Sequence, residues 1–536
     1  MTATAPSPVA GAAVGADVLA APKVAIFLLG ALGGIQAVDP LIASTALVSA
    51  SRGLGMEGAL VAFAASVSTL MLAATVISMG LLGDRIGWRR LLELGLVVSI
   101  VGDLMAAAAP GSVVFLLGRA VAGVGLGAVF AASFAYIRII TPSEKVPAAL
   151  GVYAATGSVV LVCCSLFGGV AASVDWRIAF LIVPAGCALC LVLARLLLPV
   201  TLRRSSGPMD VPGQVLLGLG IIGVLFGLSH LSRGAGAPAF WLSMSVGALL
   251  LASFVVVERR GAHPFFPVEV LRNPVFLGAV CAGFIYNFAQ SATILQFSNL
   301  WQYVDGLEPA RVSAGTLPFL LIGIVAALVT GRMITNGLRN RTVVLLGGAL
   351  AAAGGLSTLL HQSGSPYVSL LPALLLIGYG ATMASIPYGG LIVRAAAGKM
   401  APFYGPITSS RTTIGQIAYA AGLALSTVMV DGLAKGGVTK RLVDAGVPPA
   451  RTGSALDTLG VYMRTGKDPA TSAASQALQL GKESYAASFK ITMVAVGVLC
   501  LLVGLVGARL LRGVDDPGRS GRAAEPTPPV AEVAAH

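Results

Sequence analysis

The chain has 536 residues, of which 56% are hydrophobic and only 11% are charged, with a net charge of +13. A soluble domain cannot bury so large an apolar fraction in one core, so this composition predicts a protein embedded in a lipid bilayer. The positive charge does not indicate nucleic acid, because the basic residues occur in twos and threes between apolar runs of about 20 residues. All six cysteines fall inside apolar runs, which argues against a disulfide framework or a cysteine metal site.

About fourteen apolar runs are long enough to cross the bilayer as helices. They begin near Val24, Leu60, Leu91, Val113, Ala148, Ile178, Val215, Leu242, Val275, Leu317, Val343, Val368, Ile407 and Ile491. Alternate loops carry most of the basic residues, which places both termini in the cytoplasm. Residues 1–22 are rich in Ala, Pro and Gly, and residues 512–536 are polar and rich in Pro, so both ends are expected to be disordered cytoplasmic tails.

A short turn between the second and third apolar runs combines an acid, glycines and a basic cluster. A lone carboxylate at a membrane boundary is costly unless it is paired or lies at a helix N-terminus, so Asp84 is expected to form part of a conformational latch. The expected latch residues are Gly80, Asp84, Arg85, Gly87, Arg89, Arg90 and, from the thirteenth run, Arg411. The stretch from Gly331 to Arg341 is a weakened copy with Thr335 in place of the acid, which indicates two related halves.

Three charged residues lie deep inside apolar runs. A carboxylate in hydrocarbon costs at least about 2.5 kcal/mol, so each buried acid needs a partner, a cavity or a proton. Asp39, which precedes Pro40, either carries a proton or cation or only bends the first helix. Asp103 in the third run either takes part in proton coupling or forms a local hydrogen bond. Arg119 lies too deep in the fourth run to reach the surface and requires an acid or a helix carbonyl as partner.

The ninth apolar run is polar along its length without being charged. Tyr286, Gln290 and Thr293 share one helical face, and Asn287 lies on the adjoining face. These faces are expected to line a wet cavity, or alternatively to form hydrogen bonds between helices. The predicted substrate-binding residues are Tyr286, Asn287, Gln290, Thr293, Tyr379 and Tyr388, the last two from the twelfth run.

Several motifs resemble those of a known family. The pattern G-x-L-x-D-R-x-G from Gly80 to Gly87 resembles the signature between the second and third spans of the major facilitator superfamily. Asp39-Pro40, the run from Leu117 to Gly125 and Asp175-Trp176-Arg177 resemble its fourteen-span drug:proton antiporter branch, which implies a coupling role for Arg119. The antiport signature G-P-x-x-G-G of that branch reads Cys164 to Gly169 here, and the absent proline weakens the expectation of tight coupling.

The resemblance implies an all-α integral membrane protein with two six-helix halves and two extra central spans. The expected organisation is an N-terminal bundle at 23–200, a linker with two inserted helices at 201–260 and a C-terminal bundle at 261–511. A polar stretch at 431–489 is expected to be a long extracytoplasmic loop. This loop is either a solvated connector with short helices or a lid over the outer mouth.

The expected function is proton-coupled export of amphipathic organic molecules across the inner cell membrane by alternating access. The buried acids favour cationic or neutral substrates. The expected partners are the substrate, protons and the bilayer, without nucleic acid, and the protein is expected to act as a monomer. The chain lacks the phosphate-binding loop of ATP-driven pumps, and no cofactor, metal or enzymatic activity is expected. The alternatives are a facilitator without obligatory coupling, a lipid or lipid-precursor transporter, and a membrane sensor that transports nothing.

Overall fold

The computed structural model describes residues 22–57, 59–141, 146–201, 210–230, 237–261, 266–361, 367–396, 398, 400, 404–444 and 472–513. The first half of the chain forms α1 (Pro22–Leu54), α2 (Ala59–Ile86), α3 (Trp88–Ala107), α4 (Ser112–Ile140), α5 (Val146–Val174), the short α6 (Trp176–Ala179) and α7 (Ile182–Leu197). An inserted pair follows, α8 (Val211–His230) and α9 (Pro238–Arg260). The second half forms α10 (Pro274–Tyr303), α11 (Pro309–Thr335), α12 (Asn340–Ser357), α13 (Leu371–Ala395), α14 (Tyr404–Asp444) and α16 (Ser472–Leu510), with 3-10 turns η3 (Val268–Arg272), η4 (Thr358–Leu360) and η5 (Tyr367–Leu370).

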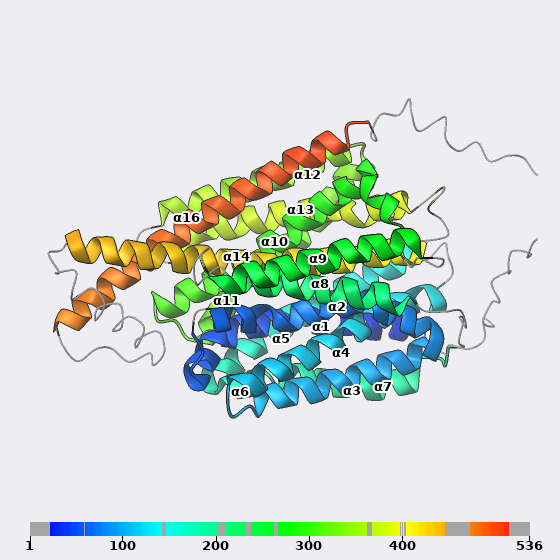
Figure 1. Cartoon of the computed structure of the whole chain (residues 1–536), viewed down its shortest axis with the longest axis horizontal. Coiled ribbons are helices and arrows are strands. Elements are labelled where there is room, and N and C mark those ends of the chain that lie inside the picture. The colour runs from blue at the N-terminus through cyan, green and yellow to red at the C-terminus, as the bar shows by residue number, and fades with distance from the viewer. Residues whose placement is uncertain are drawn as a thin grey trace, which may run out of the picture.

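Fourteen of the helices in the described part of the chain are long, and Figure 1 shows them running roughly side by side along one axis. Thirteen of them are long and apolar enough to cross a membrane. The fourteenth, α3, carries Arg90, Glu93 and Asp103 and is therefore less apolar, yet it packs along α4 and α7 within the same bundle. The predicted all-α membrane fold with fourteen spans is confirmed.

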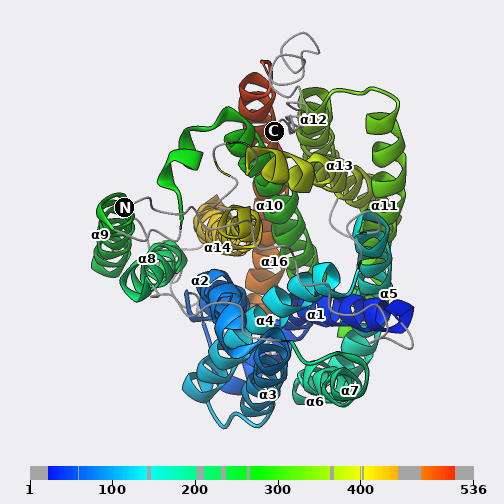
Figure 2. The same cartoon turned by 90° about the vertical axis from the view of Figure 1, so that its right-hand side faces the viewer.

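The long helices form two groups, with the inserted pair beside them. Figure 2 looks along the helices and shows α1 to α7 on one side and α10 to α16 on the other. The groups meet where α2 packs against α14 and α5 packs against α11. The inserted helices α8 and α9 pack against each other, and α8 contacts both α2 and α14 at the edge of this interface.

Because consecutive helices run antiparallel, the bundle has two distinct ends. We call the end that holds the α2–α3 turn the motif end, and the end that holds the α1–α2 connection the opposite end. Hydrogen bonds between described residues join the two halves toward the opposite end, among them Ser298 Oγ to the carbonyl of Ser44 (3.1 Å), Gln302 Nε2 to the carbonyl of Thr45 (3.1 Å), and the Ala310 amide to Ser173 Oγ (2.9 Å). The halves are therefore in direct contact toward the opposite end in this conformation.

Close packing of α3 on α4 positions two of the charged residues. A Cβ atom added to Gly102 would lie 2.2 Å from the backbone nitrogen of Ala122, and one added to Gly118 would lie 2.6 Å from that of Ala106. Only glycine permits such an approach of two helix backbones. Because Asp103 and Arg119 follow these glycines directly in the sequence, the approach places their side chains at the same depth.

The helices α14 and α16 are longer than a bilayer requires. They contain 41 and 39 residues, which at about 1.5 Å per residue is roughly 60 Å each, twice the thickness of the hydrocarbon core. Figure 1 shows both extending beyond the other helices at the opposite end. Arg441 and Glu483 form an ion pair of 2.8 Å between them there. Much of the expected loop at 431–489 is thus helical, and its centre, 445–471, lies outside the described residues.

A buried histidine at the opposite end gives the fold a pH dependence. His361, between η4 and η5, is 3% exposed, and its Nδ1 lies 2.7 Å from Ser369 Oγ. Burial lowers the pKa of His361, with a smaller contribution from Lys490. The folded protein therefore favours the neutral imidazole, so this contribution to stability is present above about pH 6.5 and declines as the pH falls below it.

We therefore expect the melting temperature of the wild-type protein to fall more steeply between pH 7.5 and pH 5 than that of His361→Gln. Thermal unfolding of both proteins in the same detergent measures the difference. Parallel curves for the two proteins would show that His361 does not contribute.

Candidate functional site

A cluster of buried charges lies inside the first half, and it joins the acid of α1 to the arginine of α4. Arg119 is fully buried, and its Nη1 and Nη2 donate to the two carboxylate oxygens of Asp39, the second at 3.0 Å. Ser68 Oγ on α2 donates to the same Asp39 carboxylate at 2.7 Å. Arg119 also lies against the ring of Phe180, with its guanidinium carbon 5.3 Å from the ring centroid. Of the two partners that the sequence allowed for Arg119, an acid or a helix carbonyl, the structure has the acid, and the sequence gave no signal for Ser68.

The second acid of the cluster is held differently. Asp103 Oδ1 lies 3.6 Å from Arg119 Nη1, which is ion-pair distance but longer than a hydrogen bond. Among the described residues, neither carboxylate oxygen of Asp103 has a hydrogen-bond partner, although the residue is fully buried. If both acids were ionised, the cluster would hold one negative charge in excess in a medium where an uncompensated charge is costly. Two carboxylates that share one guanidinium favour binding a single proton.

The polar row on α10 divides into two parts. Tyr286, Asn287 and Gln290, nearer the motif end, are partly exposed, as expected of residues that line a wet space. From Ser291 to Gln302 the polar side chains are buried, and several bond to other helices. These bonds include Gln296 Nε2 to Ser426 Oγ (2.9 Å) and the bonds of Ser298 and Gln302 to α1. Hydrogen bonding between helices is therefore observed on the far stretch, and the wet cavity along the near stretch stays a prediction.

Of the remaining predicted binding residues, one is partly exposed and two are buried. Thr293 is fully buried, and its hydroxyl has no hydrogen-bond partner among the described residues. Tyr379 on α13 is partly exposed. Tyr388 is 3% exposed and donates its hydroxyl to the carbonyl of Arg411 at 2.6 Å. Sequence reasoning did not single out Tyr153 on α5 or Tyr419 on α14, whose hydroxyl groups are both buried without a partner in the described structure.

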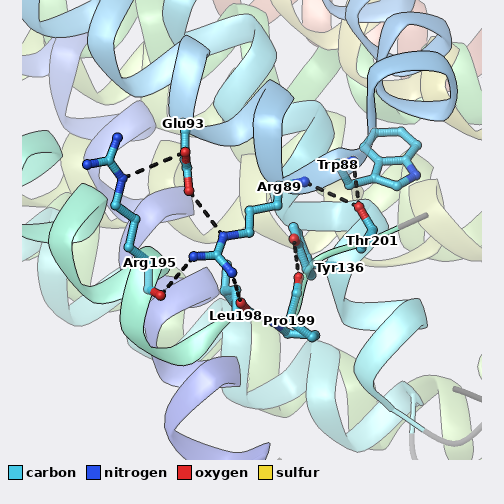
Figure 3. A network of polar contacts seen from close by, with 8 residues as sticks. All are labelled: Trp88, Arg89, Glu93, Tyr136, Arg195, Leu198, Pro199 and Thr201. Carbon is cyan, nitrogen blue, oxygen red and sulfur yellow. Dashed lines mark hydrogen bonds and ion pairs between the residues drawn. The ribbon is translucent and has the colours of Figure 1, made fainter. Parts of the chain in front are cut away.

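The turn between α2 and α3 is attached to the end of α7 by a polar network, which Figure 3 shows. Arg89 donates to the carbonyls of Arg195 (2.8 Å) and Leu198 (3.1 Å), and to Glu93 (3.1 Å). Its guanidinium therefore satisfies carbonyls that the last turn of α7 leaves open. In return, Thr201 Oγ1 accepts hydrogen bonds from the first amides of α3, at 2.8 Å and 3.4 Å.

Two glycines shape this turn. Gly87 has φ +95°, a conformation that side chains rarely adopt, and an added Cβ would lie 3.0 Å from the carbonyl oxygen of Thr201. An added Cβ on Gly83 would lie 2.5 Å from the ring of Trp88. By contrast, Gly80 faces open space, Asp84 and Arg85 are half-buried, and Arg90 is exposed. The motif therefore holds the turn in shape through Gly83, Gly87 and Arg89.

The thirteenth-run arginine assigned to the latch lies elsewhere in this conformation. Arg411, on the second turn of α14, stacks on the ring of Tyr388 with its guanidinium carbon 5.2 Å from the centroid. The expected association of Arg411 with Asp84 stays a prediction.

Two helical bundles that meet at one interface, with an ion cluster buried in one of them, are typical of secondary transporters. The model of the Major Facilitator Superfamily matches residues 24–423 of the chain, so the protein belongs to that family and is a membrane transporter rather than an enzyme.

The relatives support the multidrug resemblance. The chain is 28% identical over 427 residues to the puromycin resistance protein pur8 of Streptomyces alboniger, covering 77% of this chain and 82% of that protein. It is 23% identical over 443 residues to the multidrug efflux pump LfrA of Mycolicibacterium smegmatis, covering 82% and 86%. Among solved structures, a bacterial homologue of the human lysosomal transporter Spinster, inward-facing and unoccupied, matches with a TM-score of 0.65 at 13% identity, covering 92% of this chain and 99% of that one.

The turn gives a stability prediction with an internal control. Gly87→Ala should destabilise the protein by about 1–3 kcal/mol, because alanine is strained at this φ and meets the Thr201 carbonyl. Gly80→Ala should cause no loss, since an added Cβ there meets nothing within 4 Å. Melting temperatures in detergent compare the two, and equal values would contradict this account of the turn.

Proposed function

We propose that the protein exports amphipathic organic molecules in exchange for protons. The single observation that carries this proposal is the buried cluster of Asp39, Asp103 and Arg119, which holds one more acid than base in the transmembrane core. A transporter that only recognises substrate has no need of an excess buried carboxylate, whereas a proton-coupled one requires a group that alternates between charged and neutral. The efflux and resistance relatives support export as the direction.

The geometry favours Asp103 as the carrier of the proton in this conformation. Asp39 has both oxygens bonded to Arg119 and a third hydrogen bond from Ser68. Asp103 accepts no hydrogen bond of good geometry in the described structure, although Ser99 lies close to it, and it shares the same guanidinium at a longer distance. A proton on Asp103 makes the cluster neutral, and its loss would draw Arg119 toward both acids.

The same helix connects this cluster to the contact between the halves. Asp39 lies on α1 about 8 Å along the axis from Ser44 and Thr45, whose carbonyls bond to α10. A change in the pairing of Asp39 would therefore move the segment that holds the opposite end closed. This route gives proton binding a mechanical path to alternating access.

The proposed orientation follows from the loops. Basic residues gather at the motif end, so this end faces the cytoplasm and the opposite end faces outward, in the inner membrane of the cell. Both termini are then cytoplasmic. We propose that the protein works as a monomer. The substrate is amphipathic, and the buried acids favour a cationic or neutral group near α1.

A latch on the cytoplasmic side completes the proposed cycle. In the outward-open state, Arg411 leaves Tyr388 and joins Asp84 and Arg85 beside the start of α14. The packing of α2 along α14 supports this step, because it already places the two helices side by side.

We expect Asp39→Asn and Asp103→Asn each to abolish substrate accumulation driven by a pH gradient, because each leaves the cluster without its excess acid. Asp39→Asn should also have the lower melting temperature of the two, since it replaces the more extensively bonded carboxylate. Dye transport in proteoliposomes with an imposed pH gradient measures the first effect, and thermal unfolding measures the second.

Exchange of dye without a gradient separates coupling from binding. Asp103→Asn should keep this exchange, because Asp39 and Arg119 retain their pair. Ser133→Ala on α4, whose hydroxyl donates to the carbonyl of Val129 on its own helix, is the control and should keep accumulation. Wild-type accumulation in Asp103→Asn would refute the proton role of this residue, and accumulation of dye by the wild type without a gradient would identify a different energy source.

The latch gives a separate test. Asp84→Asn should shift the protein toward conformers open at the motif end, because the outward-open state loses a charge partner for Arg411. Cysteines placed on the two ends, reacted with a membrane-impermeant maleimide, report the shift as faster labelling at the motif end and slower labelling at the opposite end. Unchanged labelling rates at both ends would count against the latch.

A further inference from the structure

An arginine without an acidic partner lies inside the second half. Arg411 is half-buried on α14, and no acidic side chain in the described structure lies within ion-pair distance of it. Burying a guanidinium at this depth costs free energy unless the group is paired with an acid, solvated or bound to a ligand. Its carbonyl accepts from Tyr388, but its five N–H groups have no carboxylate to bind.

The contacts of Arg411 show that its side chain is directed toward the other helices and not toward lipid. Its guanidinium lies on the ring of Tyr388, and an added Cβ on Gly389 would lie 3.7 Å from its guanidinium carbon, so the side chain runs along α13. Tyr153 from α5 and Tyr286 from α10 both lie within electrostatic range of its charge. The arginine therefore lies against α13 and within electrostatic range of tyrosines on α5 from the first half and on α10 from the second.

Two phenols supply further donors that the protein itself does not use. Tyr153 and Tyr419 are 8% and 6% exposed, and neither hydroxyl has a hydrogen-bond partner in the described structure. Buried hydroxyl groups without partners are rare in folded proteins. Tyr419 lies within electrostatic range of both Tyr286 and Asp39, so these tyrosines extend from the acid cluster toward Arg411.

A guanidinium beside neutral phenol donors is suited to a planar anion, which it binds through two parallel charge-assisted hydrogen bonds. We propose that Arg411 binds the anionic group of the transported amphiphile, a carboxylate or sulfonate, while the rings of the tyrosines between Arg411 and the acid cluster hold its apolar body. This inference rests on the proposed function, since it names the substrate of that transport. It makes zwitterionic amphiphiles preferred substrates.

The proposal changes the substrate charge expected from the sequence. Cationic or neutral substrates follow from Asp39 and Asp103 only if no free positive group is present. Arg411 is such a group, and it lies at the other end of the tyrosine series from the acids. A zwitterion satisfies both ends, because its cation competes with the proton for the cluster and its anion binds Arg411.

Two probes that differ in a single charge test the site. Rhodamine B is a zwitterion at neutral pH, and its methyl ester has the same ring system without the carboxylate. Fluorescence anisotropy with purified protein in detergent gives the dissociation constant of each probe. We expect the wild-type protein to bind the zwitterion about tenfold more tightly than the ester.

Variants show which side chains produce the difference in affinity between the two probes, expressed as the ratio of their dissociation constants. Arg411→Gln should bring the ratio close to one, and Arg411→Lys should leave an intermediate value, because lysine keeps the charge without the planar fork. Arg394→Gln, which removes an exposed charge from α13 near the same end, is the control and should keep the full ratio.

Equal affinity of the wild-type protein for both probes, or an unchanged ratio in Arg411→Gln, would overturn the anion site. Failure of the proposed function gives a different result. In that case the binding ratio and its dependence on Arg411 persist, but a pH gradient drives no accumulation of rhodamine B in proteoliposomes.

Discussion

The rest of the structure depends on the burial of one guanidinium between two carboxylates. Arg119 cannot reach water, so its charge has to be neutralised inside the bundle, and Asp39 does this with both oxygens. The pairing fixes α1 against α4, while the glycines of α3 and α4 bring Asp103 to the same point. The second acid introduces a charge that only a proton or a substrate can balance.

The polar residues of α10 show how one helix serves both structure and transport. Its far half is buried and bonds to α1 and α14, which holds the two halves together toward the opposite end. Its near half leaves Tyr286, Asn287 and Gln290 partly exposed. In the proposed mechanism, α1 therefore meets the proton cluster at its middle and the contact with α10 further along. This arrangement offers a path from protonation to gating that does not pass through α5, the helix that lacks the family's proline.

Sequence patterns predicted the number of spans, the repeat and the need of Arg119 for an acid or a helix carbonyl as partner, because each depends on local hydrophobicity or on the high cost of a buried charge. They did not predict Ser68, Thr201 or Tyr419, since a hydroxyl group in an apolar run is common and its partner depends on how helices are rotated. They also treated 431–489 as a loop, although α14 and α16 continue into it. Polar composition indicates solvent exposure. Exposure does not end these two helices, however, because α14 and α16 pack on each other.

The proposed role of Arg411 shows why its position in the sequence was insufficient to predict its partner. Near the start of a span and beside a basic loop, an arginine is expected to belong to the charge network of the membrane surface. Its stacking on Tyr388 turns it inward instead, toward tyrosines from both halves. In the proposed cycle the same guanidinium has two alternative partners, the substrate anion when the motif end is open and Asp84 when it is closed. Because one guanidinium cannot serve both at once, closure of the latch would require release of the anion, and this competition would link substrate release to the change of conformation.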